Sequence, residues 1–211
     1  MFQLQTTPES IIWAVREIRE TVDDLLGSLQ KKELYFPYLS QITSENRKKE
    51  WLTVRVLLKE MLGKEKEILY TSTGKPYLPD NSYQISISHT KGFVAIALHP
   101  EMKIGIDIEH ISPRIQKIRS RFMNKKEEAN LNKEHEEIHL LLHWSAKESM
   151  FKILDEQDVD FKTYLYVNPF KPVLNNLSCF SAYETKTEAQ HVFTGYYLAN
   201  FHYVLTIVYF E

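Results

Sequence analysis

The sequence has few residues of some types and lacks several common patterns. Each of these absences excludes a structural feature or a class of protein. Its 211 residues include a single cysteine, Cys179, which excludes an internal disulfide and favours a reducing compartment. The formal net charge of -2 argues against a general nucleic-acid binder. No stretch reaches the roughly 18 uncharged apolar residues that a membrane span needs, and no secretory signal is visible at the start. We therefore expect a soluble cytoplasmic protein.

The chain also lacks Gly/Ser-rich linkers and low-complexity segments, although 43% hydrophobic residues are enough for a substantial core. Apolar spacing predicts a helix over 44–62, which Ser44 caps and Gly63 ends, and a long apolar helix over 138–154. A weakly specified helix is expected over 11–29. Strands are expected over 83–88, 93–98, 104–108, 191–198 and 203–210.

A helix followed by strands thus occurs in each half of the chain. This order predicts an α+β fold made of two similar α/β lobes. We place the N-terminal lobe at 1–103 and the C-terminal lobe at 104–211.

The strand expected near residue 104 carries two carboxylates on one face. In extended backbone Gly105, Asp107 and Glu109 alternate with three isoleucines, so the acidic side chains project together beside a glycine. An edge strand with a solvated polar face would show the same alternation.

The long apolar helix supplies a third carboxylate. Glu148 and Lys152 lie four residues apart on one face, which is also the spacing of a surface ion pair. The many apolar neighbours leave this helix little solvent-facing arc, so we expect Glu148 to point inward. If it meets Asp107 and Glu109, mutual repulsion would require a divalent cation, and oxygen-only ligands favour magnesium.

Other polar features are weaker by themselves. Ser88 and His89 follow a predicted strand, where hydroxyl, imidazole and backbone N–H groups could meet a phosphate. The loop around Lys75 lacks the spacing of a Gly-rich phosphate loop.

Taken in order, these motifs resemble those of the 4'-phosphopantetheinyl transferase superfamily, over about residues 45–155. The length of the chain is similar to that of the larger, surfactin-synthetase-activating (Sfp) type of the family. Members of this type are monomers whose two lobes are related by a pseudo-two-fold axis. The four motifs are Gly74-Lys75-Pro76-Tyr77-Leu78-Pro79, Ile85-Ser86-Ile87-Ser88-His89-Thr90, Ile104-Gly105-Ile106-Asp107-Ile108-Glu109 and Trp144-Ser145-Ala146-Lys147-Glu148-Ser149 with Lys152.

The resemblance implies transfer of 4'-phosphopantetheine from coenzyme A to a serine of an apo acyl or peptidyl carrier protein, with release of adenosine 3',5'-bisphosphate. It implies that Asp107, Glu109 and Glu148 hold Mg²⁺ on the pyrophosphate of coenzyme A. Asp107, Glu148 and Lys152 would be catalytic: Glu148 would also accept the serine proton, and Lys152 would steady the phosphates.

The resemblance further implies a coenzyme A site in the N-terminal lobe. Ser88 and His89 would contact the phosphates, and the Lys75 loop would lie against the adenine end. Arg47 and Arg55 are the candidates for the 3'-phosphate, although Arg47 reads equally well as a solvated helix charge.

The segment 114–126 carries a concentrated positive charge and no acidic residue. In a near-neutral protein this predicts a docking surface for an acidic carrier protein, with Phe122 or Met123 as the apolar anchor. A solvated run of charges is the alternative, and RNA binding is disfavoured because no aromatic platform accompanies the charges. The basic residues are Arg114, Lys117, Arg119, Arg121, Lys125 and Lys126.

Two further functions are compatible with the same residues. One is a magnesium-dependent phosphohydrolase that acts with water on a nucleotide-like substrate. The other is a non-catalytic carrier-binding relative, against which the intact set of Asp107, Glu109, Glu148 and Lys152 argues.

Overall fold

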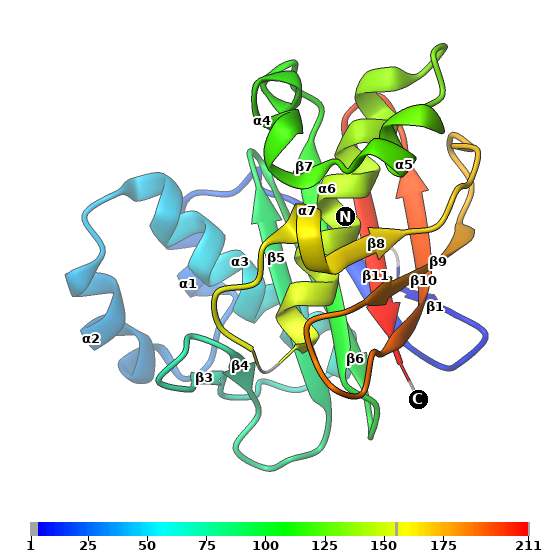
Figure 1. Cartoon of the computed structure of the whole chain (residues 1–211). Helices are drawn as coiled ribbons and strands as arrows, with labels where there is room; N and C mark the ends of the chain where they lie inside the picture. Colours follow the sequence, from blue (N-terminus) through cyan, green and yellow to red (C-terminus); the bar gives the residue numbers. More distant parts are fainter. Residues whose placement is uncertain (1–3, 155, 211) are drawn as a thin grey trace. The chain divides into compact units, whose positions relative to one another are not determined.

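The computed structural model describes residues 4–154 and 156–210, and the chain divides into two compact α+β units (Figure 1). Unit 1 is Met1–Glu101 and unit 2 is Met102–Glu211. The mixed α+β class predicted from the sequence is confirmed.

Unit 1 is built on a four-stranded antiparallel sheet in the order β1-β2-β6-β5, with a small β3-β4 ribbon. Its helix α3 begins after Ser44, whose hydroxyl accepts the Arg47 N–H, and ends at Gly63 with a left-handed φ of 68°. The elements are β1 (Gln5–Thr6), β2 (Ile12–Glu17), α1 (Val22–Gly27), α2 (Lys32–Gln41), α3 (Glu45–Leu62), β3 (Leu69–Tyr70), β4 (Pro76–Tyr77), β5 (Gln84–Thr90) and β6 (Phe93–His99).

One sequence expectation in unit 1 is wrong. The segment 11–29 is not one helix, because its first part is strand β2 and only Val22–Gly27 is helical. β2 pairs along its whole length with β6, and Trp13 and Ala14 are buried there. Pairing with a distant strand therefore overrode the weak local preference for helix.

Unit 2 is built on a five-stranded antiparallel sheet in the order β7-β11-β10-β9-β8. The long helix α6 packs on β7 and β11. The elements are β7 (Ile104–His110), α4 (Arg114–Phe122), α5 (Lys125–Ala129), α6 (Glu136–Ile153), α7 (Phe161–Tyr164), β8 (Leu165–Val167), β9 (Ser178–Glu184), β10 (Val192–Ala199) and β11 (Tyr203–Tyr209).

The two units share a strand connectivity. In unit 1 the first long strand, β2, pairs with the second strand of the β5–β6 hairpin that follows α3. In unit 2, β7 pairs in the same way with the second strand of the β10–β11 hairpin that follows α6. In each unit, a strand that precedes the long helix thus pairs with a strand that follows it.

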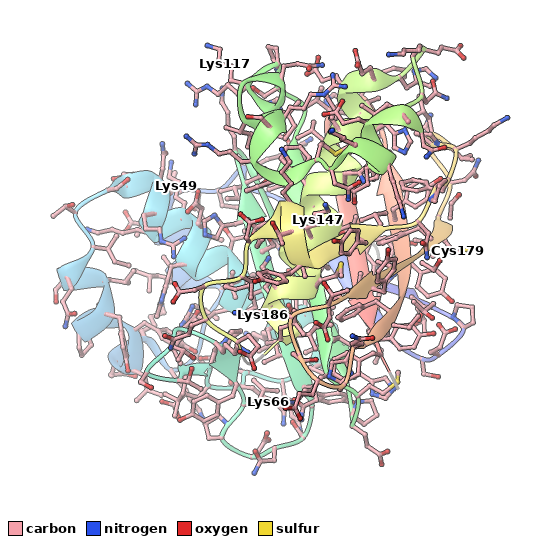
Figure 2. The ribbon with its side chains drawn as sticks, viewed as in Figure 1. Lys49, Lys66, Lys117, Lys147, Cys179 and Lys186 are labelled. Carbon is pink, nitrogen blue, oxygen red and sulfur yellow. The ribbon has the colours of Figure 1, made fainter. Side chains whose placement is uncertain are left out.

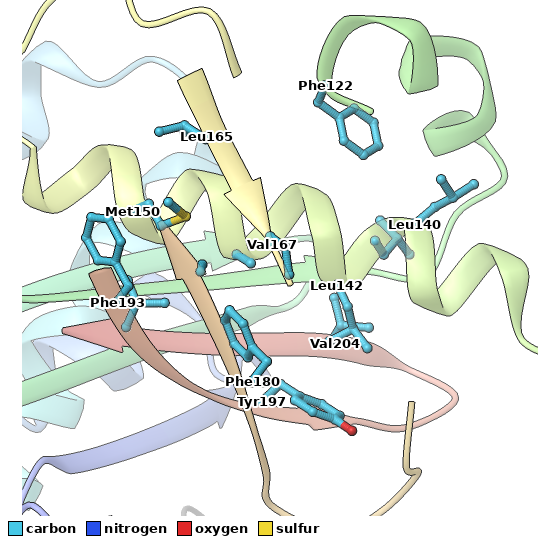
Figure 3. Packing of buried hydrophobic residues seen from close by; sticks show 14 of the residues in the cluster. Phe122, Leu140, Leu142, Met150, Leu165, Val167, Phe180, Phe193, Tyr197 and Val204 are labelled. Atoms are coloured by element: carbon cyan, nitrogen blue, oxygen red, sulfur yellow. The ribbon is translucent and has the colours of Figure 1, made fainter. Parts of the chain in front are cut away.

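The core of unit 2 lies between α6 and the inner face of its sheet. Figure 3 shows side chains from α6 and from strands β8 to β11 converging there, with Phe122 at the end of α4. Leu140, Leu142 and Met150 are fully or almost fully buried, so α6 is held in place by its apolar side.

Candidate functional site

The candidate site begins with the close approach of α6 to strand β7. A Cβ atom added at Gly105 would lie only 2.0 Å from the Ser149 carbonyl oxygen, so no larger residue fits there without a shift. The same face of β7 carries Asp107 and Glu109. β7 is an edge strand of its sheet, but the alternative of a solvated polar face is wrong, because α6 packs on that face and Asp107 is buried.

Buried hydroxyl groups fix the position of α6 on this face. The Ser145 and Ser149 hydroxyls lie 2.9 and 2.8 Å from Thr206 Oγ1, and Ser149 Oγ also donates to the Thr206 carbonyl oxygen at 3.2 Å. Ser145 Oγ donates to the Asp107 carbonyl oxygen at 3.3 Å. These hydrogen bonds fix the position of α6 along β7 and β11.

Two side chains of α6 reach the carboxylates of β7 directly. Lys152 Nζ donates to the Ile106 carbonyl oxygen at 2.6 Å and to Asp107 Oδ1 at 2.9 Å. Trp144 Nε1 donates to Glu109 Oε1 at 2.7 Å. The structure therefore brings Lys152 to Asp107 and Glu109, which lie 40 or more residues before it in the sequence.

The electrostatics place Glu148 in the same neighbourhood. Burial raises the pKa of Glu148 to about 7, and the Asp107 carboxylate adds to the rise. Burial and the same carboxylate raise the pKa of Glu109 to about 7, against the opposing hydrogen bond from Trp144. In both carboxyl groups the ionised form is disfavoured, and a third carboxylate lies nearby. Such a group of carboxyls is suited to bind a cation or to accept and release a proton.

The metal ligands remain a prediction. Within 4–154 and 156–210, no group of three or more His, Cys, Asp and Glu side chains has the arrangement of a ready metal site. The chemistry of the donors nevertheless fits magnesium, because all three predicted ligands are carboxylates and they repel one another.

In unit 1 the structure brings together two of the predicted coenzyme A residues. Arg47 on α3 and His89 on β5 are hydrogen-bonded, and both contact Glu50, from Arg47 at 3.1 Å and from His89 Nδ1 at 3.4 Å. Arg47 and His89 are exposed, whereas Ser88 is buried on β5. Arg47 and His89 thus form an accessible basic pair on unit 1.

Arg55 has a different environment from Arg47. It is 4% exposed, its guanidinium lies 3.1 Å from the centre of the Trp51 ring, and Nη1 donates to the Trp51 carbonyl oxygen at 2.9 Å. Burial lowers its pKa to about 10. Arg55 therefore packs within unit 1, and Arg47 is the more accessible candidate for a phosphate.

The loop at Lys75 is a tight turn. Thr71 N donates to the Lys75 carbonyl oxygen at 2.9 Å, and Lys75 N donates to Thr71 Oγ1 at 3.1 Å. Gly74 adopts a left-handed φ of 82°. Lys75 is partly exposed at the end of this turn. Its predicted contact with adenine stays a prediction.

The predicted apolar anchors for a carrier protein are wrong as surface features. Phe122 is 0% and Met123 is 2% exposed, because both belong to the core of unit 2. Arg119 is held in ion pairs with Glu128 and Glu136. The remaining basic residues of the segment are exposed, and we call them the basic surface: Arg114, Lys117, Arg121, Lys125 and Lys126.

Sequence reasoning assigned no role to Lys147 and Glu127, which form a buried ion pair with Nζ 2.8 Å from Oε2. A signal for Lys147 was available. It lies three residues before Met150 and seven after Leu140, so helical spacing puts this lysine on the apolar side. A charge on such a face needs a buried partner.

No helix in the part of the chain that the structure describes is both long enough and apolar enough to cross a membrane.

Comparison with known proteins agrees with the geometry of unit 2. A family model for the 4'-phosphopantetheinyl transferase superfamily matches residues 103–203. The 4'-phosphopantetheinyl transferases AcpT of Escherichia coli O157:H7 and of strain K12 are each 30% identical over 112 residues, 50% of this chain and 57% of theirs. The AcpT protein of Salmonella typhi is 28% identical over 133 residues, 60% of this chain and 69% of its own.

The chain thus matches little more than half the length of the E. coli relatives. The region that the family model matches contains both β7 and α6, the two elements that carry the clustered carboxylates. Through this region, the chain is similar to the 4'-phosphopantetheinyl transferase superfamily.

Proposed function

We propose that this protein transfers the 4'-phosphopantetheine group of coenzyme A to a serine of an apo acyl or peptidyl carrier protein. The packing of α6 on β7 carries the proposal, because it gathers Asp107, Glu109, Glu148 and Lys152 at one place in unit 2. The E. coli and Salmonella relatives are themselves 4'-phosphopantetheinyl transferases.

In the proposed reaction, the serine oxygen forms a bond to the phosphorus next to the pantetheine arm. The bond from that phosphorus to the bridging oxygen of the pyrophosphate breaks, and adenosine 3',5'-bisphosphate leaves with the bridging oxygen. Phosphoryl transfer of this kind depends mainly on alignment and charge neutralisation.

Glu148 is the proposed acceptor of the serine proton, directly or through a water molecule. Without a bound cation the pKa of Glu148 is about 7, which suits a general base near neutral pH, and Mg²⁺ held by the same carboxylate would lower this pKa. The Lys152 ammonium would compensate negative charge on the phosphates. Asp107, Glu109 and Glu148 would hold Mg²⁺, which would neutralise charge on the pyrophosphate oxygens.

The proposed coenzyme A contacts of unit 1 are His89 and Ser88 with the phosphates, Arg47 with the 3'-phosphate and the Lys75 turn with the adenine. The accessible pair of Arg47 and His89 supports the phosphate assignment, because two cationic or donor groups lie together there. We expect a monomer, as for the larger members of the superfamily.

The test is to incubate the protein with coenzyme A, Mg²⁺ and an apo carrier protein, and to weigh the carrier by mass spectrometry. We expect a gain of one phosphopantetheine group, lost on chelation and restored by Mg²⁺. Release of phosphate from coenzyme A without any carrier would favour the phosphohydrolase instead. A folded protein that modifies none of the carriers offered, fatty-acid, polyketide and peptide types included, would contradict the proposal.

Glu148→Gln should reduce the rate of transfer by about 10²–10⁴-fold, since it removes the proposed base and a ligand together. Glu137→Gln, the same change in the first turn of α6, is the matched control and should keep the activity. Equal rates for the two variants would show that Glu148 is not part of the chemistry.

A further inference from the structure

The buried ion pair of Lys147 and Glu127 lies beside the candidate site without belonging to it. Lys147 is 0% exposed, and Figure 2 labels it within unit 2, whereas Lys117 of α4 is exposed. Its ammonium donates to Glu127 Oε2 at 2.8 Å and to the carbonyl oxygens of Phe122 at 2.6 Å and Phe161 at 3.2 Å. All three protons of the ammonium group therefore have acceptors.

Glu127 is the second centre of this arrangement. Besides Lys147, its carboxylate accepts the backbone N–H of Asn124 at 3.0 Å and that of Val167 at 2.9 Å. It thus caps the start of α5 and ties α5 to β8. Through the ion pair, the end of α4, helix α5 and strand β8 are joined to α6 at one point.

An outer ion-pair cluster reinforces the same junction. Arg119 on α4 contacts Glu128 on α5 and Glu136 at the start of α6, at 2.9 Å for the Arg119 Nη1–Glu136 Oε1 pair. These groups are partly exposed and screened by solvent, so they hold the junction less firmly than the buried pair. On its buried side, the segment that carries the basic surface is therefore held by the contacts of Lys147 with the end of α4 and with Glu127 of α5.

We propose that Lys147 is a positioning residue, which sets the basic surface in register with the neighbouring catalytic residue Glu148. The inference rests on the proposed function, because the role of that register is to bring the carrier serine to the site. Two consecutive residues of α6 then have separate tasks. Lys147 holds the docking surface from within, and Glu148 faces the carboxylates of β7.

The test uses the full chain with Lys147→Met and, as the milder change, Glu127→Gln. Two quantities are measured: hydrogen exchange of the amides in 114–129, and KM for the apo carrier beside KM for coenzyme A. We expect faster exchange in 114–129 and a rise of about tenfold in KM for the carrier, which corresponds to ~1.4 kcal/mol. KM for coenzyme A should change less than twofold.

Glu184→Gln is the matched control. Glu184 is also a fully buried carboxylate of unit 2, and it accepts the N–H groups of Thr187 and His191, beyond the end of β9. This variant should lose stability without a change in KM for the carrier or in exchange over 114–129.

The inference is overturned if folded Lys147→Met keeps the wild-type exchange in 114–129, or if KM for the carrier rises equally in Glu184→Gln. A wild-type protein that modifies no carrier would overturn the proposed function and the docking role with it. Faster exchange confined to 114–129 in Lys147→Met would still support the anchoring of the segment, so the two failures are distinguishable.

Discussion

Lys152 joins helix α6 to the carboxylate strand through two hydrogen bonds, one to the Ile106 carbonyl oxygen and one to Asp107 Oδ1. A positive charge this close to three carboxylates lowers their repulsion when no substrate is bound. The Lys152 ammonium group can also exchange one of these acceptors for a phosphate oxygen, because it can redirect its three N–H donors.

We therefore predict that Lys152→Met lowers kcat/KM for transfer by about 10²-fold, the usual scale for loss of one charge-stabilising group. Steady-state kinetics with a saturating carrier would measure this. The control is Lys133→Met, an equivalent change at an exposed site of unit 2. Similar kinetics for both variants would remove Lys152 from the proposed mechanism.

His139 makes the stability of unit 2 depend on pH. It is 1% exposed, and its Nδ1 accepts the Asn132 N–H at 3.0 Å. Burial, together with His143, lowers its pKa from 6.5 to about 4. An unfolded imidazole binds a proton below pH 6.5, while the folded one stays neutral down to about 4, so protons favour the unfolded state in this range.

The free energy of unfolding should therefore fall as the pH is lowered from 6.5 to about 4, by up to ~3 kcal/mol from this residue. In His139→Gln, which retains an acceptor for Asn132, urea unfolding at pH 7 and pH 4.5 should differ by less than in the wild type. The same pH dependence in both proteins would assign the effect to other groups, His143 among them.

At the scale of elements, the site depends on the contact between β7 and α6 more than on either alone. Gly105 permits the contact, since a methyl group there would meet the backbone of Ser149 rather than a side chain that could move. Backbone cannot yield locally, so the whole helix would have to shift along the strand that carries Asp107.

Gly105→Ala should thus destabilise the protein by about 1–3 kcal/mol and lower the transfer rate as well. Gly27→Ala is the matched control, because nothing lies within 4 Å of a Cβ at that helical position and φ is not left-handed. Thermal unfolding and transfer rates of the two variants test this. Unchanged stability of Gly105→Ala would show that α6 has room to move.

At the scale of the whole molecule, a net charge of -2 conceals a local positive surface. Five exposed basic residues of segment 114–126 form it, and the acidic residues that balance them in sequence are elsewhere or already in ion pairs, as for Glu128 with Arg119. Such a surface speeds and orients the approach of an acidic partner without contributing an apolar anchor.

We predict that the double change Lys117→Glu with Arg121→Glu raises KM for an acidic carrier by tenfold or more, and removes most of its dependence on salt. The pair Lys171→Glu with Lys186→Glu carries the same charge change outside this surface and should have little effect. KM measured between 50 and 500 mM NaCl would decide. If KM of the wild-type protein for the carrier does not change over this range of salt concentration, electrostatic docking is wrong.

The sequence by itself determined the α+β class, the long helices and the acidic and glycine positions of β7, because these depend on local periodicity and on residue chemistry. It could also name the carboxylates by their resemblance to a family. Helix α3, with its serine cap and its glycine end, is a case where short-range signals sufficed.

Only the tertiary structure decided which side chains are covered and which meet. Phe122 and Met123 are buried because α4 ends against the core of unit 2, and a charged run does not reveal on which side its apolar residues pack. The residues 12–17 became a strand through pairing with β6, far along the chain. The pairing of Lys147 with Glu127 likewise joins residues 20 apart, a contact that arises only once α5 packs against α6.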